Sequence, residues 1–284
     1  MFIFARNNII IKMNKPILLV LCVLMSTLSI AQDKVKGSRV LSTNTTDINP
    51  FNRLLLTEDF EVKLVKAETA AVKIVTDENL HDYIQIIDKD STLTLKTTAK
   101  LRFKKQEITV FYTDALNTIE LKEEAEIFSE NSLKFNDLTL VTSDNSRAFL
   151  TVECTMIKHI NEGKARNKLN ITADNVTLEL NGDSKIEALI NASKIEADLL
   201  ESADAQIEGD AKDLDLNVDN SSEFNGEKLS IKDINITTLN RAEAKVNASS
   251  DLNINASGTS EIEIYGSPKI NIESFEDNAI LKKK

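Results

Sequence analysis

Three glutamates recur at a nearly constant spacing in the second half of the chain, namely Glu223, Glu243 and Glu261. Each follows a predicted turn by three residues, and equivalent positions in a stack of parallel strands lie about 4.8 Å apart. Carboxylates about 5 Å apart serve retaining glycosidases, and wider pairs serve inverting ones. This acidic column could also hold a divalent cation through hard oxygen ligands. The third interpretation is a solvated face that binds a partner or only keeps the protein soluble.

The surrounding composition argues against a catalytic use of the acidic column. No Arg or His recurs beside it, and the two histidines, His81 and His159, are distant in sequence. Trp is absent and aromatic residues make up 5% of the chain, whereas ligand clefts are usually lined by apolar and aromatic side chains. We therefore predict a protein that is not an enzyme, with no catalytic residue, no cofactor and no metal ligand, and with the acidic column as a candidate binding surface.

Charge and cysteine content exclude further classes. The chain carries 34 basic and 45 acidic residues and a net charge of −11, so nucleic acid, which needs Lys and Arg against phosphates, is not an expected partner. Two cysteines cannot build a disulfide scaffold or a Cys₄ zinc site. We expect Cys154 to be a small buried apolar residue. The length of 284 residues suits one large domain or two small ones.

The N-terminal segment has the form of a secretory signal. Basic residues precede an apolar run at residues 17–31, which ends in Ser29-Ile30-Ala31. The run is shorter than the roughly 20 residues that a membrane-crossing helix needs. We therefore predict cleavage between Ala31 and Gln32, export from the cytoplasm, and no transmembrane segment in the mature protein.

The rest of the sequence alternates and then repeats. From Phe51 onward apolar and polar residues alternate, which is typical of half-buried strands. In the second half the pattern recurs with a mean period near 19 residues, too short for a unit to bury its own apolar side chains. Stacked units would bury them, so the repeat predicts an all-β parallel β-helix, or β-solenoid, over an antiparallel sandwich. The predicted turns lie near Asn145, Gly163, Gly182, Ala203, Asn220, Asn240, Gly258 and Asp277.

The domain plan follows from these patterns. Residues 1–31 are the signal, 32–50 are a polar leader, and 51–284 form one solenoid domain. Residues 51–115 are less regular, and the sequence leaves open whether they form coils or a separate antiparallel cap. Asparagines of Asn-x-Ser/Thr triplets fall repeatedly in the second half, where stacked amides could form hydrogen-bond ladders: Asn191, Asn220, Asn235, Asn247 and Asn255.

Two stretches resemble a known family. The C-terminal residues Ser257-Gly258 and Tyr265-Gly266-Ser267-Pro268 resemble the signature of the head GIN domain of Gram-negative bacteria, labelled an autotransporter adhesin. The front end, with Phe51-Asn-Arg-Leu and Phe60-Glu-Val-Lys-Leu, is similar too. The resemblance covers roughly residues 50 to 282 and implies a right-handed parallel β-helix. It departs at the corners, where only Gly258 keeps the Ser-Gly form, and it carries no catalytic residues.

These observations lead to one functional expectation and two alternatives. We expect an exported, non-enzymatic β-solenoid for adhesion, binding or scaffolding, located in the periplasm or on the outer surface of a Gram-negative cell. Its partner would be a glycan or an envelope protein. The alternatives are a polysaccharide-acting enzyme on the same fold and a periplasmic sensing or envelope-stress partner whose acidic face docks a basic protein.

Overall fold

The computed structural model describes residues 34–284, so the predicted signal and its cleavage site at Ala31 and Gln32 lie outside the described residues. Within these residues strands make up 67% and helix 2%. The described part contains one short 3₁₀ helix, η1 (Glu78–Tyr83). None of its helical structure has the length and apolar character that crossing a bilayer requires.

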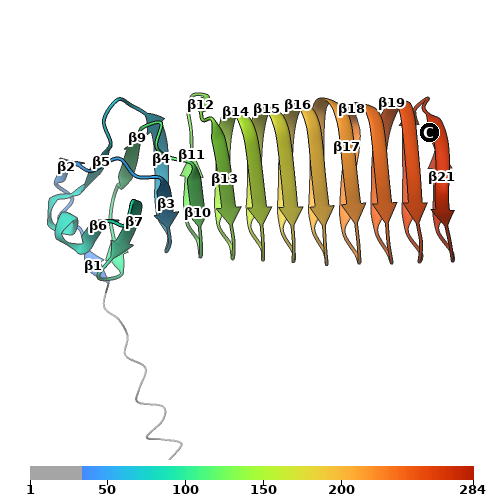
Figure 1. Ribbon diagram of the computed structural model, residues 1–284. Coiled ribbons are helices and arrows are strands. Elements are labelled where there is room, and N and C mark those ends of the chain that lie inside the picture. The colour runs from blue at the N-terminus through green and yellow to red at the C-terminus, as the bar shows by residue number, and fades with distance from the viewer. Residues whose placement is uncertain (1–33) are drawn as a thin grey trace, which may run out of the picture.

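The predicted parallel β-solenoid is confirmed, with about nine turns and coils about 19 residues apart. Figure 1 shows the coils stacked along one rod, with an irregular N-terminal part at one end. Each regular coil is one long strand that pairs in parallel with its successor. These strands are β14 (Arg147–Asn161), β15 (Arg166–Leu180), β16 (Lys185–Leu199), β17 (Asp204–Val218), β18 (Glu223–Thr238) and β19 (Glu243–Ala256).

Each long strand bends and contributes to two faces of the rod. In β14 the buried residues are even-numbered up to Val152 and odd-numbered from Ile157, so the inward direction changes near Thr155. We call the half that follows a corner the first face and the half that precedes the next corner the second face. Inward side chains of both faces meet in one core that runs along the rod. Register partners such as Ile157, Val176 and Ile195 stack in that core.

The corners are fixed by one residue with positive φ in each coil. Glycine, Asn and Asp tolerate this left-handed conformation, which costs other residues about 1–2 kcal/mol. All the predicted turns are present, and at two of them the residue with positive φ lies one or two positions before the residue named: Asp144 (59°) near Asn145 and Glu201 (67°) near Ala203. Ala203 is small because it is buried inside the corner. The remaining corners lie at Gly163, Gly182, Asn220, Asn240, Gly258 and Asp277, as predicted.

A small residue fills the inside of every corner, two positions after the residue with positive φ. Serine and alanine alternate strictly at this place along the rod. Each serine hydroxyl therefore stacks between two methyl groups, and Ser222 Oγ accepts a hydrogen bond from the Ala203 N–H at 3.2 Å. The alternating set is Ala125, Ser146, Ala165, Ser184, Ala203, Ser222, Ala242, Ser260 and Ala279.

The N-terminal part, which we call the cap, combines the two possibilities that the sequence left open. Antiparallel pairs join β2 to β5, β5 to β9 and β6 to β7, while β3 and β4 pair in parallel with the first coil. The cap strands are β1 (Val35–Lys36), β2 (Leu41–Asp47), β3 (Arg53–Leu56), β4 (Glu61–Lys66), β5 (Ala71–Asp77), β6 (Ile84–Lys89), β7 (Thr92–Thr97), β8 (Leu101–Arg102) and β9 (Glu107–Tyr112).

The predicted polar leader, residues 32–50, needs a correction. Its residues 41–47 form β2, which pairs with β5 over its whole length. The strand is polar but contains Thr43, Thr45 and Thr46, whose β-branched side chains favour extended backbone. The low hydropathy of this segment therefore led to the prediction of a leader where the structure has a strand at the edge of the cap.

Shorter strands complete the rod at its two ends. The first coils contain β10 (Thr118–Leu121), β11 (Glu126–Phe128), β12 (Leu133–Lys134) and β13 (Asp137–Thr142). The last coils contain β20 (Glu261–Gly266), β21 (Lys269–Phe275) and β22 (Ile280–Lys283). Ile270 and Ile272 continue the core columns of Leu252 and Ile254, and because no further coil is stacked on them in residues 34–284, they are 39% and 50% exposed.

Candidate functional site

The structure places the three residues of the acidic column in direct register. Glu223 pairs with Glu243, and Glu243 pairs with Glu261, on the outer surface of the first face. Asp204 pairs with Glu223 and adds a fourth carboxylate. Asp204 also follows its corner residue, Glu201, by three positions. Because the sequence pattern predicted this corner near Ala203, counting three positions from it did not lead to Asp204.

The same column changes sign further along the rod. The register continues from Asp204 to Lys185, Arg166 and Arg147. Lys185 Nζ lies 2.8 Å from Asp204 Oδ2 and closes the junction between the basic and the acidic segments. At the far end Lys282 pairs with Glu261. Beyond Arg147 the register returns to acidic residues, Glu126 and Glu61. The acidic column is therefore one segment of a charged row whose sign changes in the middle of the rod and again near the cap.

The side chains of this charged row lie on the surface and do not line a cleft. Glu223 and Glu243 are exposed and Glu261 is half-buried. Within residues 34–284 no group of three or more His, Cys, Asp or Glu residues is arranged to hold a metal ion. His159 and His81 lie on other elements, inside β14 and in η1. Binding through the acidic column stays a prediction.

A row of hydrogen-bonded amides runs along the second face. Asn235 Nδ2 donates to Asp215 Oδ1 at 2.7 Å, Asn253 Nδ2 donates to Asn235 Oδ1 at 2.8 Å, and Asn271 Nδ2 donates to Asn253 Oδ1 at 3.2 Å. We call these four residues the amide ladder. The Asn235 hydrogen bond and the nearby Lys194 ammonium hold the pKa of Asp215 below its usual value. Of the five asparagines singled out in the sequence, Asn235 belongs to this ladder.

A column of three aspartates lies next to the amide ladder on the same face. Asp213, Asp233 and Asp251 are register partners in successive coils. Lys232 Nζ lies 3.1 Å from Asp233 Oδ2 and offsets part of the repulsion between these carboxylates. From β17 to β19 the second face is therefore a regular surface of amides and carboxylates.

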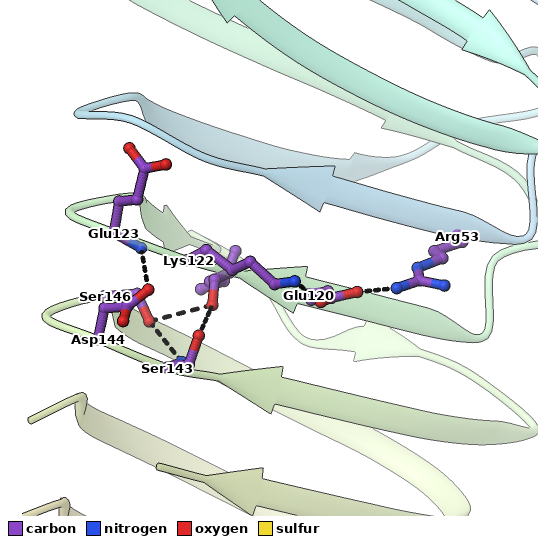
Figure 2. A network of polar contacts seen from close by, with 8 residues as sticks. Arg53, Glu120, Lys122, Glu123, Ser143, Asp144 and Ser146 are labelled. Atoms are coloured by element: carbon purple, nitrogen blue, oxygen red, sulfur yellow. Dashed lines mark hydrogen bonds and ion pairs between the residues drawn. The ribbon is translucent and has the colours of Figure 1, made fainter. Parts of the chain in front are cut away.

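The junction between cap and solenoid holds a partly buried ion triad. Figure 2 shows Arg53, at the start of β3, beside Glu120 on β10 and Lys122, which follows the end of β10. Glu120 is 7% exposed, and its carboxylate pairs with Arg53 and, at 2.7 Å, with Lys122 Nζ. Burial alone would raise the pKa of Glu120, but hydrogen bonds from Lys122 and Arg53 outweigh it and lower that pKa. The triad joins β3 of the cap to β10 of the first coil.

Carboxylates beside this triad accept hydrogen bonds from backbone N–H groups. A hollow of about 730 Å³ lies where the cap meets the first corners, and acidic residues line it. Asp144 Oδ2 accepts the Glu123 N–H at 2.9 Å, as Figure 2 shows, and Glu123 Oε2 accepts the Glu58 N–H at 3.2 Å. Glu58 in turn accepts the Thr97 N–H at 3.1 Å. Because each of these carboxylates caps the backbone of a neighbouring strand or corner, their first role is structural.

The lone cysteine of the described residues is a poor nucleophile. Cys154 is half-buried and packs against the core at the end of the first face. Burial, with the nearby Asp137 and Asp174, raises the pKa of its thiol to about 11. The thiolate is therefore scarce near neutral pH, as expected for a structural residue.

Solved structures share this fold at low sequence identity. The crystal structure of a "putative adhesin" from Parabacteroides distasonis has a TM-score of 0.64 at 19% identity and covers 88% of this chain and 100% of its own. A second, from Parabacteroides merdae, has a TM-score of 0.56 at 21% identity, with 89% and 99% covered. A "putative lipid binding protein" from Parabacteroides distasonis has a TM-score of 0.57 at 16% identity, with 89% and 100% covered.

Comparison with protein families shows which family the chain belongs to. No protein with a curated description matches the chain. The family described as "Putative auto-transporter adhesin, head GIN domain" matches residues 50–189 and 156–268. The two matches together span well over half of the chain and include both stretches that carried the resemblance. The chain belongs to the head GIN domain family.

Proposed function

We propose that this protein is an exported, non-enzymatic solenoid that acts at the cell envelope by adhesion, ligand binding or scaffolding. The observation that carries the proposal is the amide ladder of Asp215, Asn235, Asn253 and Asn271 on the second face. Each asparagine uses one of its two amide hydrogens within the ladder and keeps the other for a ligand. Groups held in one orientation before binding lose little conformational freedom when a ligand arrives.

A glycan is the partner class that fits this surface best. Sugar hydroxyls both donate and accept hydrogen bonds, which suits a mixed row of amides and carboxylates. Because the ladder runs through four successive coils, a polymer that lies along this part of the rod would meet a similar contact in each of the four. The adhesin description of the family supports a binding role and a place at or outside the cell envelope.

The ladder can be tested with one substitution and a matched control. Asn253→Asp replaces the donor to Asn235 with a carboxylate, while Asn191→Asp makes the same change on the first face. Both variants and the natural protein would be applied to a glycan microarray. We expect binding that Asn253→Asp abolishes and Asn191→Asp retains, with unchanged melting temperatures. Absence of glycan binding by the natural protein, or equal loss in both variants, would refute the proposal.

The compartment needs its own experiment. Intact cells would be treated with protease, with a periplasmic protein as the control for membrane integrity. Removal of the protein from whole cells would support adhesion to outside surfaces. Survival until the outer membrane is opened would refute that role, and an envelope partner would then take its place.

A further inference from the structure

A second surface feature lies on the cap, far from the amide ladder in sequence and different in charge. A hollow of about 410 Å³ is lined by Lys36, Gly37, Arg39, Arg102, Phe103 and Lys104. We call it the basic pocket. Four of its six residues are cations, although the chain as a whole has a net charge of −11. The four cationic side chains are exposed and so are accessible to a ligand.

The charge of the chain is divided unevenly along its length. Residues 34–112 hold 13 basic and 11 acidic side chains, whereas residues 113–284 hold 18 basic and 33 acidic ones. The cap is therefore close to neutral and slightly basic, and the rod is strongly acidic. Cations gathered in one pocket of the cap create a local positive potential.

The walls of the basic pocket are fixed by the fold. Strands β1 and β8 form a small parallel sheet in which Lys36 and Arg102 are register partners. The Gly37 N–H donates to the Arg102 carbonyl at 2.9 Å. Asn79 holds the loop after β1, since its Oδ1 accepts the Ser38 N–H at 2.7 Å and its Nδ2 donates to the Lys36 carbonyl at 3.0 Å. The pocket is thus built from two segments that lie more than 60 residues apart in sequence.

One carboxylate lies under the pocket and belongs to its frame. Asp77 is fully buried, and its Oδ2 accepts the Lys104 N–H at 3.1 Å. A Cβ at Gly37 would come within 2.1 Å of that oxygen, so only glycine lets the β1 loop lie against it. Asp77 therefore holds the backbone of one wall at Lys104 and lies against the backbone of the other at Gly37. One carboxyl group faces four cationic side chains.

The four cations have no partner among the described residues. Ion pairs bind four of the nine other basic side chains of the cap, namely Arg53, Lys63, Lys66 and Lys105. Across residues 34–284 none of them involves Lys36, Arg39, Arg102 or Lys104. Like charges gathered in this way repel each other, and a bound anion would remove that repulsion.

We propose that the basic pocket binds a multiply charged anion that carries phosphoryl or sulfate groups. Guanidinium groups bind such groups through two parallel hydrogen bonds, and ammonium groups add point charges. Arg39 and Arg102 supply the first kind of contact, and Lys36 and Lys104 supply the second. Phe103, which is 44% exposed at the rim, offers an apolar contact to whatever carries the anion. This site is independent of the proposed glycan surface.

The test uses sodium pyrophosphate as the probe, measured by isothermal titration calorimetry at low and at physiological salt. We expect saturable binding that weakens as salt rises, and a loss of at least tenfold in affinity in Arg102→Gln and in Lys36→Gln. Lys73→Gln, on β5 of the same cap and outside the pocket, is the control and should change affinity less than twofold. Absence of binding at millimolar pyrophosphate, or equal weakening by the control, would overturn the proposal.

A second arm distinguishes a lipid headgroup from a free phosphorylated molecule. The full chain would be sedimented with vesicles of phosphatidylglycerol, and with phosphatidylcholine as the neutral control. Binding to the anionic vesicles that Arg102→Gln abolishes and pyrophosphate displaces supports the pocket with a headgroup as the source. Pyrophosphate binding without vesicle binding supports it with a free anion. If Arg102→Gln has the melting temperature of the natural protein and leaves vesicle binding unchanged, that result would contradict binding of a lipid headgroup in the basic pocket.

Discussion

His159 lies wholly inside the rod, and both nitrogens of its ring have partners. Nδ1 contacts the Leu140 carbonyl at 3.1 Å, and Nε2 lies 3.2 Å from Asn167 Nδ2. The carbonyl can only accept, so Nδ1 carries the proton and Nε2 accepts from the amide. A second proton on Nε2 would face the N–H donor of Asn167, away from solvent. Burial accordingly lowers the pKa of His159 to about 4, and the Leu140 hydrogen bond raises it only in part.

This shift predicts a dependence of stability on pH. In the unfolded chain the imidazole titrates near pH 6.5. Between pH 6.5 and 4 the unfolded state therefore binds more protons than the folded state, and the free energy of unfolding falls as pH falls. Since one pKa unit corresponds to 1.36 kcal/mol, the gap corresponds to a loss of about 3 kcal/mol across that window. Above pH 6.5 His159 adds no pH dependence.

The assay is urea unfolding of the natural protein and of His159→Leu from pH 7.5 to pH 4. Leucine is the matched choice because the register partners of His159 are Leu140 and Leu178. At pH 7.5 the variant should lose about 1–3 kcal/mol, since the Leu140 carbonyl and one contact of Asn167 lose their partner. Titrating carboxylates affect both proteins equally, so the difference between the two curves isolates His159. Parallel curves from pH 7 to pH 4 would refute the reasoning.

Three further predictions concern the charged row, the triad and one corner. Glu120→Gln should destabilise the protein by about 1–2 kcal/mol in thermal melts, because Arg53 and Lys122 lose a mostly buried partner. The loss is limited because both cations are half-exposed. Glu124→Gln, outside the triad, is the control and should change the stability little. Combined substitution of Glu223, Glu243 and Glu261 by glutamine should leave stability within about 1 kcal/mol of the natural value at low salt, since like charges about 5 Å apart at the surface repel weakly and the ion pair that Glu261 loses with Lys282 is open to solvent; a loss of several kcal/mol would show that the column does more than carry charge. Glu201→Gly should raise stability by up to about 1 kcal/mol, because Glu201 has a φ of 67°, and a drop in melting temperature would contradict that account of the corner.

The repeat of the second half could be predicted because its cause is local in the sequence. A period of about 19 residues and two-residue alternation specify which side chains point inward, and Leu252, Ile254 and Ile262 are buried as that pattern requires. Near Asn145 and Ala203 the pattern locates the turn but not the residue with positive φ, because small or polar residues occur on both sides of a turn. Only backbone angles distinguish Glu201, with its positive φ, from the buried alanine two residues later.

The cap and its pocket could not be predicted in this way. Lys36 and Arg102 lie close together because β1 pairs with β8, and this pairing leaves no periodic signal in either segment. The threonines of β2 likewise form a strand through tertiary pairing with β5 rather than through an apolar pattern. Asn167 occupies an inward position between Ala148 and Ile186, where the sequence pattern calls for an apolar residue. Its partners come from neighbouring coils, so the buried polar cluster around His159 appears only once the coils are stacked.

The alternation of serine and alanine inside the corners gives the rod a second, longer period of two coils. Deleting one coil would place two serines or two alanines in contact at the point of closure, whereas deleting two neighbouring coils would restore the original order. We therefore expect the rod to change length in steps of two coils, about 10 Å, which is twice the spacing of parallel strands. A version of this protein shortened by one such pair should keep the corner packing of the full-length rod, and a version shortened by a single coil should not.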